Sequence, residues 1–395
     1  MTRSERADVV IIGGAIVGSS VAMFLAGRPD FDGRIIVVER DPTFQTASTT
    51  LSAASIRLQF STPLNIEISR FGLDMVRHPE RYLAVEGEAP SLDFVERGYL
   101  FLATEAGLRT LEHNHRVQRS VDVPVALLSP RDLMVRFPWL NVEDLAAGSL
   151  GLAGEGWFDA YALLQGVRRK ARSMGVLERT GEVVRMERDG VGISSVVLAD
   201  DTRIEARWVV NAAGPRAAIV AGMAGVELPV RPRKRFVYHV ESPVALGGAP
   251  LTIDPSGVYV RPEGPAFLAG FSPRGTDADP DTLDLTVDRA PFDDFVWPTL
   301  AHRIPAFDRL RLIDAWAGLY EVNPIDHNAI VGPHPTVPNL LLANGFSGHG
   351  LQQAPAVGRG LAEWIATGRY TTLDLSPLGF GRLERGQPIP ELNVV

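Results

Sequence analysis

The feature that most limits the fold of this chain is a glycine-rich turn, GGAIVG at residues 13–18, between an apolar run and a helical segment. The run before it, residues 7–12, is apolar and rich in β-branched side chains, and residues 17–26 have the period of a helix. A second buried strand, RIIVVE, follows at residues 34–39. Strand, turn, helix and strand in this order predict the start of a parallel sheet.

The residues of the turn indicate a dinucleotide site. Gly13 permits a tight turn, Gly18 lets the helix pack on the strand, and amides at the helix N-terminus face a pyrophosphate. Glu39 ends the second strand, where its carboxylate can accept hydrogen bonds from an adenosine ribose and disfavours a 2′-phosphate. The pattern departs from the usual fingerprint at Ala15, where glycine is expected, and Gly14 relieves part of the crowding. The alternative is a structural turn that binds no phosphate.

The composition excludes several chemistries. Lys plus Arg number 39 against 47 Asp plus Glu, a net charge of −8, so nucleic acid and anionic membranes are poor partners. The absence of cysteine removes disulfides, thiolate metal ligands, iron–sulfur clusters and cofactors tethered through sulfur, and we expect no metal site. Lys170 and Lys234 are the only lysines, so a mechanism that needs a lysine must use one of them.

The first 27 residues superficially resemble a secretory leader, with early arginines and an apolar stretch. Glycines interrupt that stretch, and a second strand with a terminal acid follows it, which a cleaved leader has no reason to carry. No segment reaches the roughly 20 apolar residues of a membrane span. We therefore expect a cytoplasmic protein, as a monomer or a homo-oligomer.

Later segments return to the nucleotide-binding style. Asp159 can cap a helix over residues 160–173 that Gly175 ends. Residues 181–188, 194–199 and 202–211 are predicted strands, and the last leads into small residues at 212–214 that could let a cofactor approach the backbone. The alternative for this segment is a core strand that meets an ordinary turn. Residues 85–150 and 230–316 differ, with more proline, more aromatic residues and strand-like alternation.

These patterns predict a chain of mixed class, α/β plus α+β, with two interleaved domains. The first is a discontinuous Rossmann-like nucleotide-binding domain of residues 1–84, 151–229 and 317–376. The second is an inserted antiparallel-sheet substrate domain of residues 85–150 and 230–316. Residues 377–395 form a C-terminal tail.

With the turn, Glu39, VVNAAGP at 209–215 and especially NGFSGHGLQQAPAVGRGLAEWIATG at 344–368, the sequence resembles the D-amino-acid oxidase superfamily of FAD enzymes. Within it, the sequence is most similar to the sarcosine and dimethylglycine oxidase branch and to the FAD-dependent oxidoreductase-domain proteins. The resemblance covers residues 7–378. It implies a bound FAD and a substrate domain whose sheet covers one face of the flavin.

The resemblance also implies which residues hold FAD. Sarcosine oxidases tether the flavin through a cysteine just before a tyrosine, and the corresponding stretch here is residues 318–320, GLY, so we expect non-covalent FAD. Amides of residues 345–351 would face the flavin pyrimidine end; the alternative for His349 is a local helix cap. The implied cofactor-binding residues are Gly13, Gly14, Ala15, Ile16, Val17, Gly18, Glu39, Arg40, Ser48, Thr49, Val183, Ala213, Gly214, Gly318, Leu319, Gly345, Phe346, Ser347, Gly348, His349, Gly350, Leu351 and Gln352.

The substrate site departs from the family. Gln352 stands where sarcosine oxidases have the lysine that pairs the substrate carboxylate. An arginine fork matches a carboxylate, so we expect Arg57 and Arg261 to replace that lysine; the alternative is a structural or solvated ion pair. Tyr259 and Tyr320 would shape the pocket, and His349 or Gln352 would line the flavin edge.

We thus expect FAD-dependent oxidation of a small carboxylated secondary amine, such as sarcosine, dimethylglycine or iminodiacetate, to an imine that hydrolyses. Two arginines favour the doubly acidic members. Electrons would pass to oxygen, giving hydrogen peroxide, although the family's oxygen-activating lysine has no match at 266–270, and Lys234 lies in RPRKRF, predicted to be mostly a solvated loop. The alternatives are a dehydrogenase of an amine or 2-hydroxy acid with a quinone or carrier acceptor, and a non-catalytic flavoprotein assembly factor.

Overall fold

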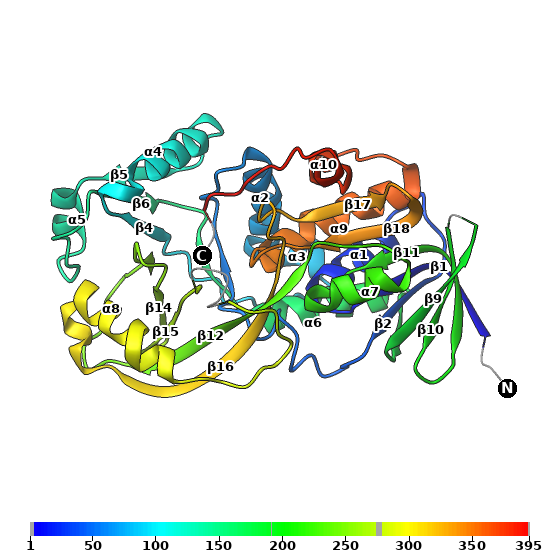
Figure 1. Cartoon of the computed structure of the whole chain (residues 1–395), viewed down its shortest axis with the longest axis horizontal. Helices are drawn as coiled ribbons and strands as arrows, with labels where there is room; N and C mark the ends of the chain where they lie inside the picture. The colour runs from blue at the N-terminus through cyan, green and yellow to red at the C-terminus, as the bar shows by residue number, and fades with distance from the viewer. Residues whose placement is uncertain (1–3, 191, 274–278, 394–395) are drawn as a thin grey trace.

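The computed structural model describes residues 4–190, 192–273 and 279–393. These residues form two eight-stranded sheets and one two-stranded sheet. Figure 1 shows the two large sheets toward opposite ends of the long axis, with the long strands β12 and β16 reaching from one toward the other. The mixture of parallel and antiparallel sheets confirms the predicted fold class.

The first sheet is parallel at its centre. Its order is β17-β18-β11-β1-β2-β8, and β10 joins β11 and carries β9. β1 pairs in parallel with β2 and β11, so Ile12 lies beside Val38 and Asn211 and the carboxyl ends of these strands meet at one edge. Its strands are β1 (Ser4–Ile12), β2 (Ile35–Glu39), β8 (Leu177–Thr180), β9 (Val183–Asp189), β10 (Gly192–Leu198), β11 (Arg203–Asn211), β17 (Ile330–His334) and β18 (Val337–Asn344).

Both faces of this sheet are covered, because side chains alternate along β1. Val9 and Ile11 join one buried cluster, and Val10 and Ile12 join another. Helices α1 (Ile16–Ala26), α2 (Pro63–Arg77), α3 (Pro79–Leu83), α6 (Ala160–Ser173) and α9 (Gly350–Thr367) contribute to the first cluster, and α7 (Ala217–Met223) contributes to the second. Two-sided burial is the usual condition of a parallel sheet.

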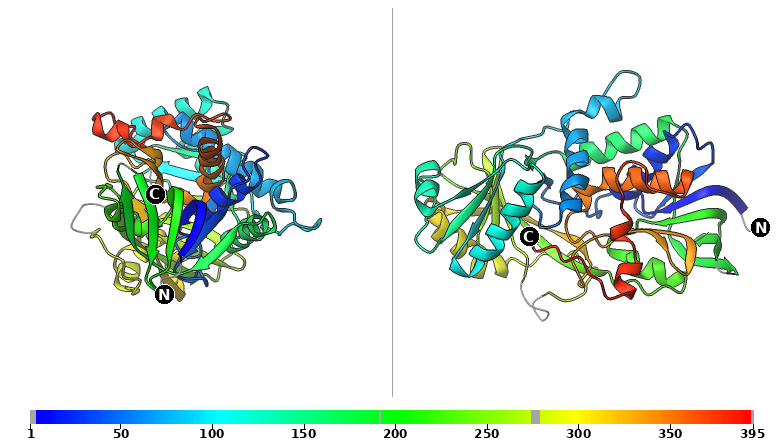
Figure 2. Two further views of the ribbon diagram at one scale, coloured as in Figure 1. Left: turned by 90° about the vertical axis from the view of Figure 1, so that its right-hand side faces the viewer. Right: turned by 90° about the horizontal axis from the view of Figure 1, so that it is seen from above.

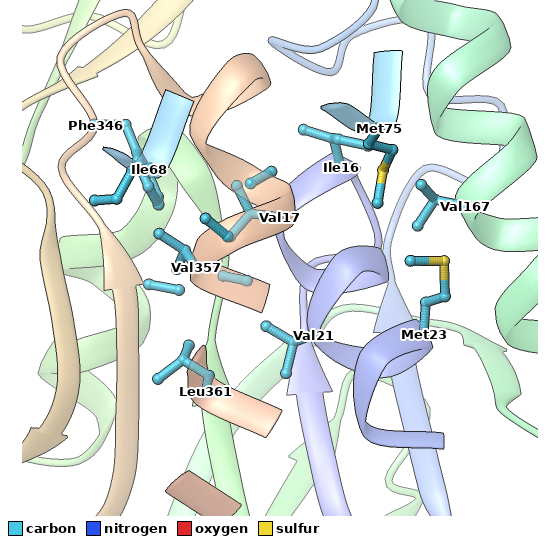
Figure 3. Close-up of a cluster of buried hydrophobic side chains, with 14 of the residues drawn as sticks. Ile16, Val17, Val21, Met23, Ile68, Met75, Val167, Phe346, Val357 and Leu361 are labelled. Atoms are coloured by element: carbon cyan, nitrogen blue, oxygen red, sulfur yellow. The ribbon is translucent and has the colours of Figure 1, made fainter. Parts of the chain in front are cut away.

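Helices α1 and α9 are in close contact on the first face. Figure 3 shows Val17 and Val21 of α1 facing Val357 and Leu361 of α9. A Cβ atom added at Gly358 would come within 2.6 Å of the Ser20 side chain, so glycine permits this close approach. The packing fixes the start of α9, and with it the loop at 345–349, against the start of α1.

The second sheet is largely antiparallel, in the order β16-β12-β15-β14-β13-β4-β6-β5. Its strands are β4 (Tyr99–Ala103), β5 (Val125–Leu128), β6 (Ala147–Gly151), β12 (Arg231–Glu241), β13 (Leu251–Ile253), β14 (Tyr259–Glu263), β15 (Ala266–Gly270) and β16 (Arg311–Val322). The small sheet pairs β3 (Ser55–Ile56) with β7 (Gly156–Trp157). The remaining helices are α4 (Glu105–Ser120), α5 (Pro130–Arg136), α8 (Trp297–Arg303) and α10 (Gly381–Glu384), with short turns η1 (Gly214–Arg216), η2 (Phe292–Val296), η3 (Pro305–Arg309) and η4 (Ser376–Leu378).

Several predictions of local structure are confirmed. The opening strand, helix and strand are β1, α1 and β2, and the predicted helix at 160–173 is α6, capped by the Asp159 side chain, which accepts a hydrogen bond of 2.8 Å from Ala162 N.

The prediction for RPRKRF was wrong, because residues 231–236 belong to β12 and pair along β16. The predicted domain boundaries stay a prediction, although β16 runs through residue 317 without a break. In the described part of the chain, no helix combines the length and apolar character needed to cross a membrane.

Candidate active site

A cavity of about 490 Å³ lies at the edge where the parallel strands of the first sheet end. Its wall also contains segment 283–285, the β16 stretch 319–321 and the start of α9. Ligands of open parallel sheets bind at this edge. Of the predicted cofactor-binding residues, the wall contains Gly13, Ala15, Ile16, Val17, Glu39, Arg40, Ser48, Thr49, Val183, Ala213, Gly214, Leu319, Phe346, Gly348, Gly350 and Leu351. Gly14, Gly18, Gly318, Gly345, Ser347, His349 and Gln352 lie outside the wall.

The glycine-rich turn works as the sequence predicted. Gly13 has φ +100°, and a Cβ there would come within 2.3 Å of the Ala212 carbonyl oxygen. A Cβ at Gly18 would come within 1.9 Å of the Gly13 carbonyl oxygen, so α1 can start next to the strand only with glycine there. Ala15 occupies the N-cap position of α1 and makes no side-chain cap, which leaves the helix N-terminus open to an anion.

Glu39 is held in place by two backbone donors. Its Oε2 accepts from Gly14 N at 2.8 Å, and its Oε1 accepts from Asp41 N at 2.8 Å. A carboxylate has further lone pairs, so these contacts fix its orientation and still leave capacity for the hydroxyls of a ribose. Glu39 therefore fits the role predicted for it at the cavity wall.

The loop before α9 has an unusual backbone path. Gly345 and Gly348 have φ +74° and +94°, and Ser347 adopts φ +52° although it is not glycine. A Cβ at Gly348 would come within 2.5 Å of the Tyr320 ring, so this glycine lets the loop lie against Tyr320 of β16. Ser347 is fixed by Glu321, whose carbonyl oxygen accepts from Ser347 N at 3.0 Å. Helix α9 starts at Gly350 with no side-chain cap.

These features fit FAD. The turn and the open N-terminus of α1 would hold the pyrophosphate, Glu39 the ribose, and the α9 loop the flavin. Bound there, FAD would supply the two-electron oxidant, while the protein supplies orientation and electrostatics. No group of three His, Asp or Glu side chains among the described residues could hold a metal.

Arg57 lies next to the α9 loop in a largely closed environment. It is 3% exposed, and its Nη2 lies 2.8 Å from Nε2 of His349, between two glycines of the cavity wall. Its guanidinium carbon is 4.6 Å from the centre of the Phe60 ring and 5.3 Å from that of Phe101. The Tyr320 side chain, which lines the cavity, is close enough to interact electrostatically with Arg57.

The charge of Arg57 has no partner of opposite sign in direct contact among the described residues. Its Nη1 is buried and makes no hydrogen bond. Burial lowers the pKa of the guanidinium, and Tyr99, Glu391 and Glu155 offset this in part. Burying a cation without a counter-ion costs free energy, unless a ligand supplies the opposite charge and the missing hydrogen bonds. Arg57 therefore has the properties of an anion site.

His349 and Gln352 position Arg57. His349 stands at the N-cap of α9 but makes no side-chain cap, contrary to the alternative of a local helix cap; its side chain contacts Arg57. Burial, then Arg57, hold the pKa of His349 well below its usual range. Gln352 accepts a 2.8 Å hydrogen bond from Arg57 N through Oε1. The sequence predicted that His349 or Gln352 would line the flavin edge, which stays a prediction; in the structure both contact Arg57.

Arg261 differs from Arg57, because its Nη1 and Nε already have partners, one of them a carboxylate. Its Nη1 pairs with Glu263 and bonds the Pro262 carbonyl oxygen, and its Nε bonds the Ala53 carbonyl oxygen at 3.1 Å. This corresponds to the structural ion pair that the sequence left as the alternative. The predicted role of Arg261 as a second carboxylate anchor therefore has no support.

Tyr259 and Tyr320 lie with Tyr99 around this site. Burial raises the pKa of all three phenols, that of Tyr99 to about 12, so all are neutral at physiological pH. Tyr259 interacts electrostatically with both other tyrosines. Tyr99 and Tyr320 also interact electrostatically with Arg57, so the predicted pair belongs to a group of three hydroxyls, two of which are close to Arg57.

Several wall and neighbouring residues were not predicted. Glu321 follows Tyr320 in β16, lines the cavity, and burial raises its pKa to about 8. A charged residue directly after the uncharged stretch 315–320 was the signal that could have found it. Segment 283–285 and Phe60, Tyr99 and Phe101 carry no motif, and only the tertiary structure brings them to the site.

The geometry agrees with the relatives of the chain. Residues 8–364 match the DAO family of FAD-dependent oxidoreductases, and the chain belongs to that family. It is therefore an FAD-dependent oxidoreductase, which confirms the predicted cofactor and the predicted class of enzyme.

Particular relatives refine the comparison. FAD-dependent oxidoreductase domain-containing protein 1 of Bos taurus is 44% identical over 98% of this chain and 87% of its own length. Human mitochondrial sarcosine dehydrogenase is 26% identical over 92% of this chain but only 40% of its own length. Among solved structures, L-proline dehydrogenase from P. horikoshii is 27% identical with a TM-score of 0.84, covering 98% of this chain and 100% of that one.

Proposed function

We propose that the protein oxidises the carbon–nitrogen bond of a small secondary amine that carries one carboxylate. The observation that carries this proposal is the buried guanidinium of Arg57, which has an unpartnered Nη1 and contacts the loop at the cavity wall. A substrate carboxylate would supply the missing negative charge and accept from an arginine fork. Sarcosine and proline are substrates of this class to test, and dimethylglycine is the tertiary amine to compare with them.

The comparison of the two predicted anchors, Arg57 and Arg261, supports one carboxylate and not two. The sequence alone favoured doubly acidic amines such as iminodiacetate, because it offered both Arg57 and Arg261. Arg261 is 4% exposed and already neutralised by Glu263. Of the two predicted anchors, only Arg57 lacks a carboxylate in direct contact among the described residues, so a monocarboxylate satisfies its charge, and a second carboxylate would find Arg261 already paired.

The surroundings of Arg57 support selection of a neutral amine. Burial, then the charge of Arg57, hold the pKa of His349 well below its usual range, so the ring is neutral and its Nε2 accepts from Arg57. Tyr99, Tyr259 and Tyr320 are neutral hydroxyls that can accept or donate. A site with no charged base in contact would bind the amine in its neutral form, and its residues would orient a C–H next to nitrogen toward the flavin.

For the electron acceptor, we propose a quinone or a carrier protein in place of the oxygen expected from the sequence. Both lysines already have partners, since Lys234 Nζ pairs at 2.8 Å with Asp284 of the cavity wall and Lys170 Nζ donates to the Ala84 carbonyl oxygen at 2.9 Å. Neither is free to play the oxygen-activating part that a lysine has in sarcosine oxidases. The relatives named dehydrogenases favour the same acceptor class.

The test is an anaerobic screen of sarcosine, dimethylglycine, proline and iminodiacetate, followed by bleaching of the flavin absorbance. We expect a monocarboxylated secondary amine to bleach the flavin, and iminodiacetate to bleach it more slowly. Admission of air should then restore the colour slowly, whereas a quinone should restore it quickly. Failure of every amine to bleach the flavin would refute the substrate class; fast release of peroxide would restore oxygen as acceptor.

The cellular location belongs to the same proposal. A cytoplasmic protein is the prediction from sequence, while the sarcosine dehydrogenase relative is named mitochondrial. Detection of the protein in fractionated cells of its source decides between the two.

A further inference from the structure

Residues 388–393, here called the strap, end beside the substrate site. After α10 the chain runs back across the molecule toward the region between the two large sheets, as the red segment in Figure 2 shows. Asp326 holds the strap on this path, because its Oδ2 accepts from Ile389 N at 3.1 Å and its carbonyl oxygen accepts from Glu391 N at 2.9 Å. Arg382 in turn fixes the Asp326 carboxylate at 2.8 Å.

Glu391 anchors the strap firmly. It is 2% exposed, and its carboxylate accepts from Ser61 N and Ser61 Oγ at 2.7 Å, from Thr62 N at 3.2 Å and from Asn65 Nδ2 at 3.0 Å. Hydrogen bonds to a carboxylate are stronger than neutral ones. The strap is thus fixed at Glu391, whose partners Ser61 and Thr62 lie only a few residues along the chain from Arg57.

The tip beyond Glu391 is held by weaker contacts. Leu392 N donates to Ser61 Oγ at 2.8 Å, and Asn393 Nδ2 donates to the Gln59 carbonyl oxygen at 2.6 Å. The Asn393 carbonyl oxygen accepts from Arg57 Nη2. The contacts of the tip with residues 57, 59 and 61 use neutral acceptors. Asn393 N also donates to Glu391 Oε1 at 3.0 Å, but this bond lies within the strap, so the tip can leave Arg57 while the Glu391 anchor stays in place.

The contact with Asn393 limits how Arg57 can bind a carboxylate. An Nη2 group has two hydrogens, and here one faces Nε2 of His349 and the other the Asn393 carbonyl oxygen. A carboxylate can bind a guanidinium at two points in two ways, either end-on to Nη1 and Nη2 or side-on to Nε and Nη2. Both ways use Nη2. A carboxylate can therefore form the full fork only when one of the two present acceptors withdraws. His349 is packed edge-on against Phe60 at the start of α9, whereas Asn393 lies on the tip.

We propose that the Asn393 carbonyl is an internal ligand of Arg57, which the substrate carboxylate displaces. This rests on the proposed function of Arg57 as the carboxylate site. A carboxylate neutralises the buried cation, which a carbonyl does not do, so only an anion gains enough to replace the tip. The strap thereby makes the site selective for carboxylated ligands and keeps Nη2 paired when no substrate is bound.

The test uses the FAD-loaded protein and acetate, a carboxylate with no oxidisable amine. Asn393→Ala removes the Nδ2 contact with Gln59 and loosens the tip, while Arg57 and His349 stay unchanged. Loss of one neutral hydrogen bond should lower the acetate Kd by about twofold to tenfold, measured by calorimetric titration. Leu392→Ala is the matched control, because the Leu392 side chain is 53% exposed, and its Kd should equal that of the unmodified protein. An unchanged or higher Kd for Asn393→Ala would show that acetate does not displace the Asn393 carbonyl from Arg57, and would overturn the inference.

Amide hydrogen exchange follows the displacement directly. Acetate should speed the exchange of the peptide that contains Leu392 and Asn393, because Leu392 N and Asn393 N lose their present acceptors. Arg57→Ala should abolish both acetate binding and this change. If acetate binds but exchange stays constant, the displacement is refuted and the proposed function stands. If acetate binds equally well to Arg57→Ala, both are refuted.

Discussion

Nη2 of Arg57 lies 2.8 Å from Nε2 of His349, and this contact determines which ring nitrogen of the histidine carries the proton. An arginine only donates, so Nε2 must accept and the ring proton must be on Nδ1. Burial and the arginine charge both hold the pKa of His349 well below its usual range. The site therefore has one cation beside a neutral ring, and its positive charge is concentrated on Arg57.

Replacement of Arg57 should weaken substrate binding more than any other single change at the site. Arg57→Ala removes the cation that would bind the carboxylate, and a hydrogen bond to a charged group is worth roughly 1.5–3 kcal/mol, or about a 10- to 150-fold rise in KM. The flavin content of the purified variant should stay normal, because Arg57 is not in the cavity wall. Steady-state kinetics with the amine that bleaches the flavin provide the measurement.

Arg261→Lys is the matched control for Arg57. Arg261 is also buried, but its charge is already paired with Glu263. A lysine can keep that ion pair, so KM should change less than twofold, which is below about 0.4 kcal/mol. A large rise in KM for Arg261→Lys, with Arg57→Ala unaffected, would exchange the roles of the two arginines.

Acid should release all of the flavin. The chain has no cysteine, and the position that carries the tether in sarcosine oxidases lies in the stretch Gly318, Leu319, Tyr320. Gly318 has no side chain that could be tethered, and a Cβ there would come within 3.2 Å of Leu51. After precipitation with trichloroacetic acid, the yellow colour should be in the supernatant; yellow protein in the pellet would contradict a non-covalent FAD.

Glu39 should contribute to the affinity for FAD. Glu39→Gln puts an amide group where the carboxylate now accepts from both Gly14 N and Asp41 N, so one of these donors faces a poor partner. We expect the FAD Kd of the apoprotein to rise by about tenfold, equivalent to about 1.4 kcal/mol, measured from flavin fluorescence during reconstitution. Glu5→Gln, at the far end of β1, serves as the control and should leave this Kd unchanged.

The sequence predicted those parts of the site that depend on local backbone geometry. The turn between β1 and α1 has room only for glycine at positions 13 and 18, and Glu39 stands at the end of β2. The spacing of these residues along the chain is therefore enough to find them. The α9 loop was predicted from the resemblance of residues 344–368 to the D-amino-acid oxidase superfamily. Such residues interact within a single β-α-β unit or one loop, where chain connectivity limits the possible arrangements.

The substrate side could not be predicted to the same depth. The sequence around Arg57 and Arg261 does not show which of them is free to bind a substrate. Only the tertiary structure shows that Glu263 neutralises Arg261 and that no described carboxylate contacts Arg57. The strap is a stronger case, since Asn393 reaches Arg57 across almost the whole length of the chain. Nothing in its residue types marks it, because its role comes from the Glu391 anchor on residues 61–65.

Glu321 should make the stability of the apoprotein depend on pH. Burial raises its pKa from about 4.5 to about 8, so the folded state retains a proton that the unfolded state has lost over this range. Its contribution to the free energy of unfolding is therefore fully present below about pH 4.5 and is lost as the pH rises through 8. Each pKa unit corresponds to about 1.4 kcal/mol, so the loss is on the order of a few kcal/mol.

Glu321→Gln isolates this effect, because glutamine has the shape of the protonated acid and can still accept from Gly345 N, now 3.1 Å from Glu321 Oε2. Urea denaturation of the flavin-free protein at pH 5.5 and at pH 8 should show a larger decrease in the unmodified protein than in the variant. Other titrating groups contribute equally to both proteins and cancel in the comparison. Equal decreases would mean that Glu321 is ionised in the folded state at pH 5.5, and would contradict the raised pKa.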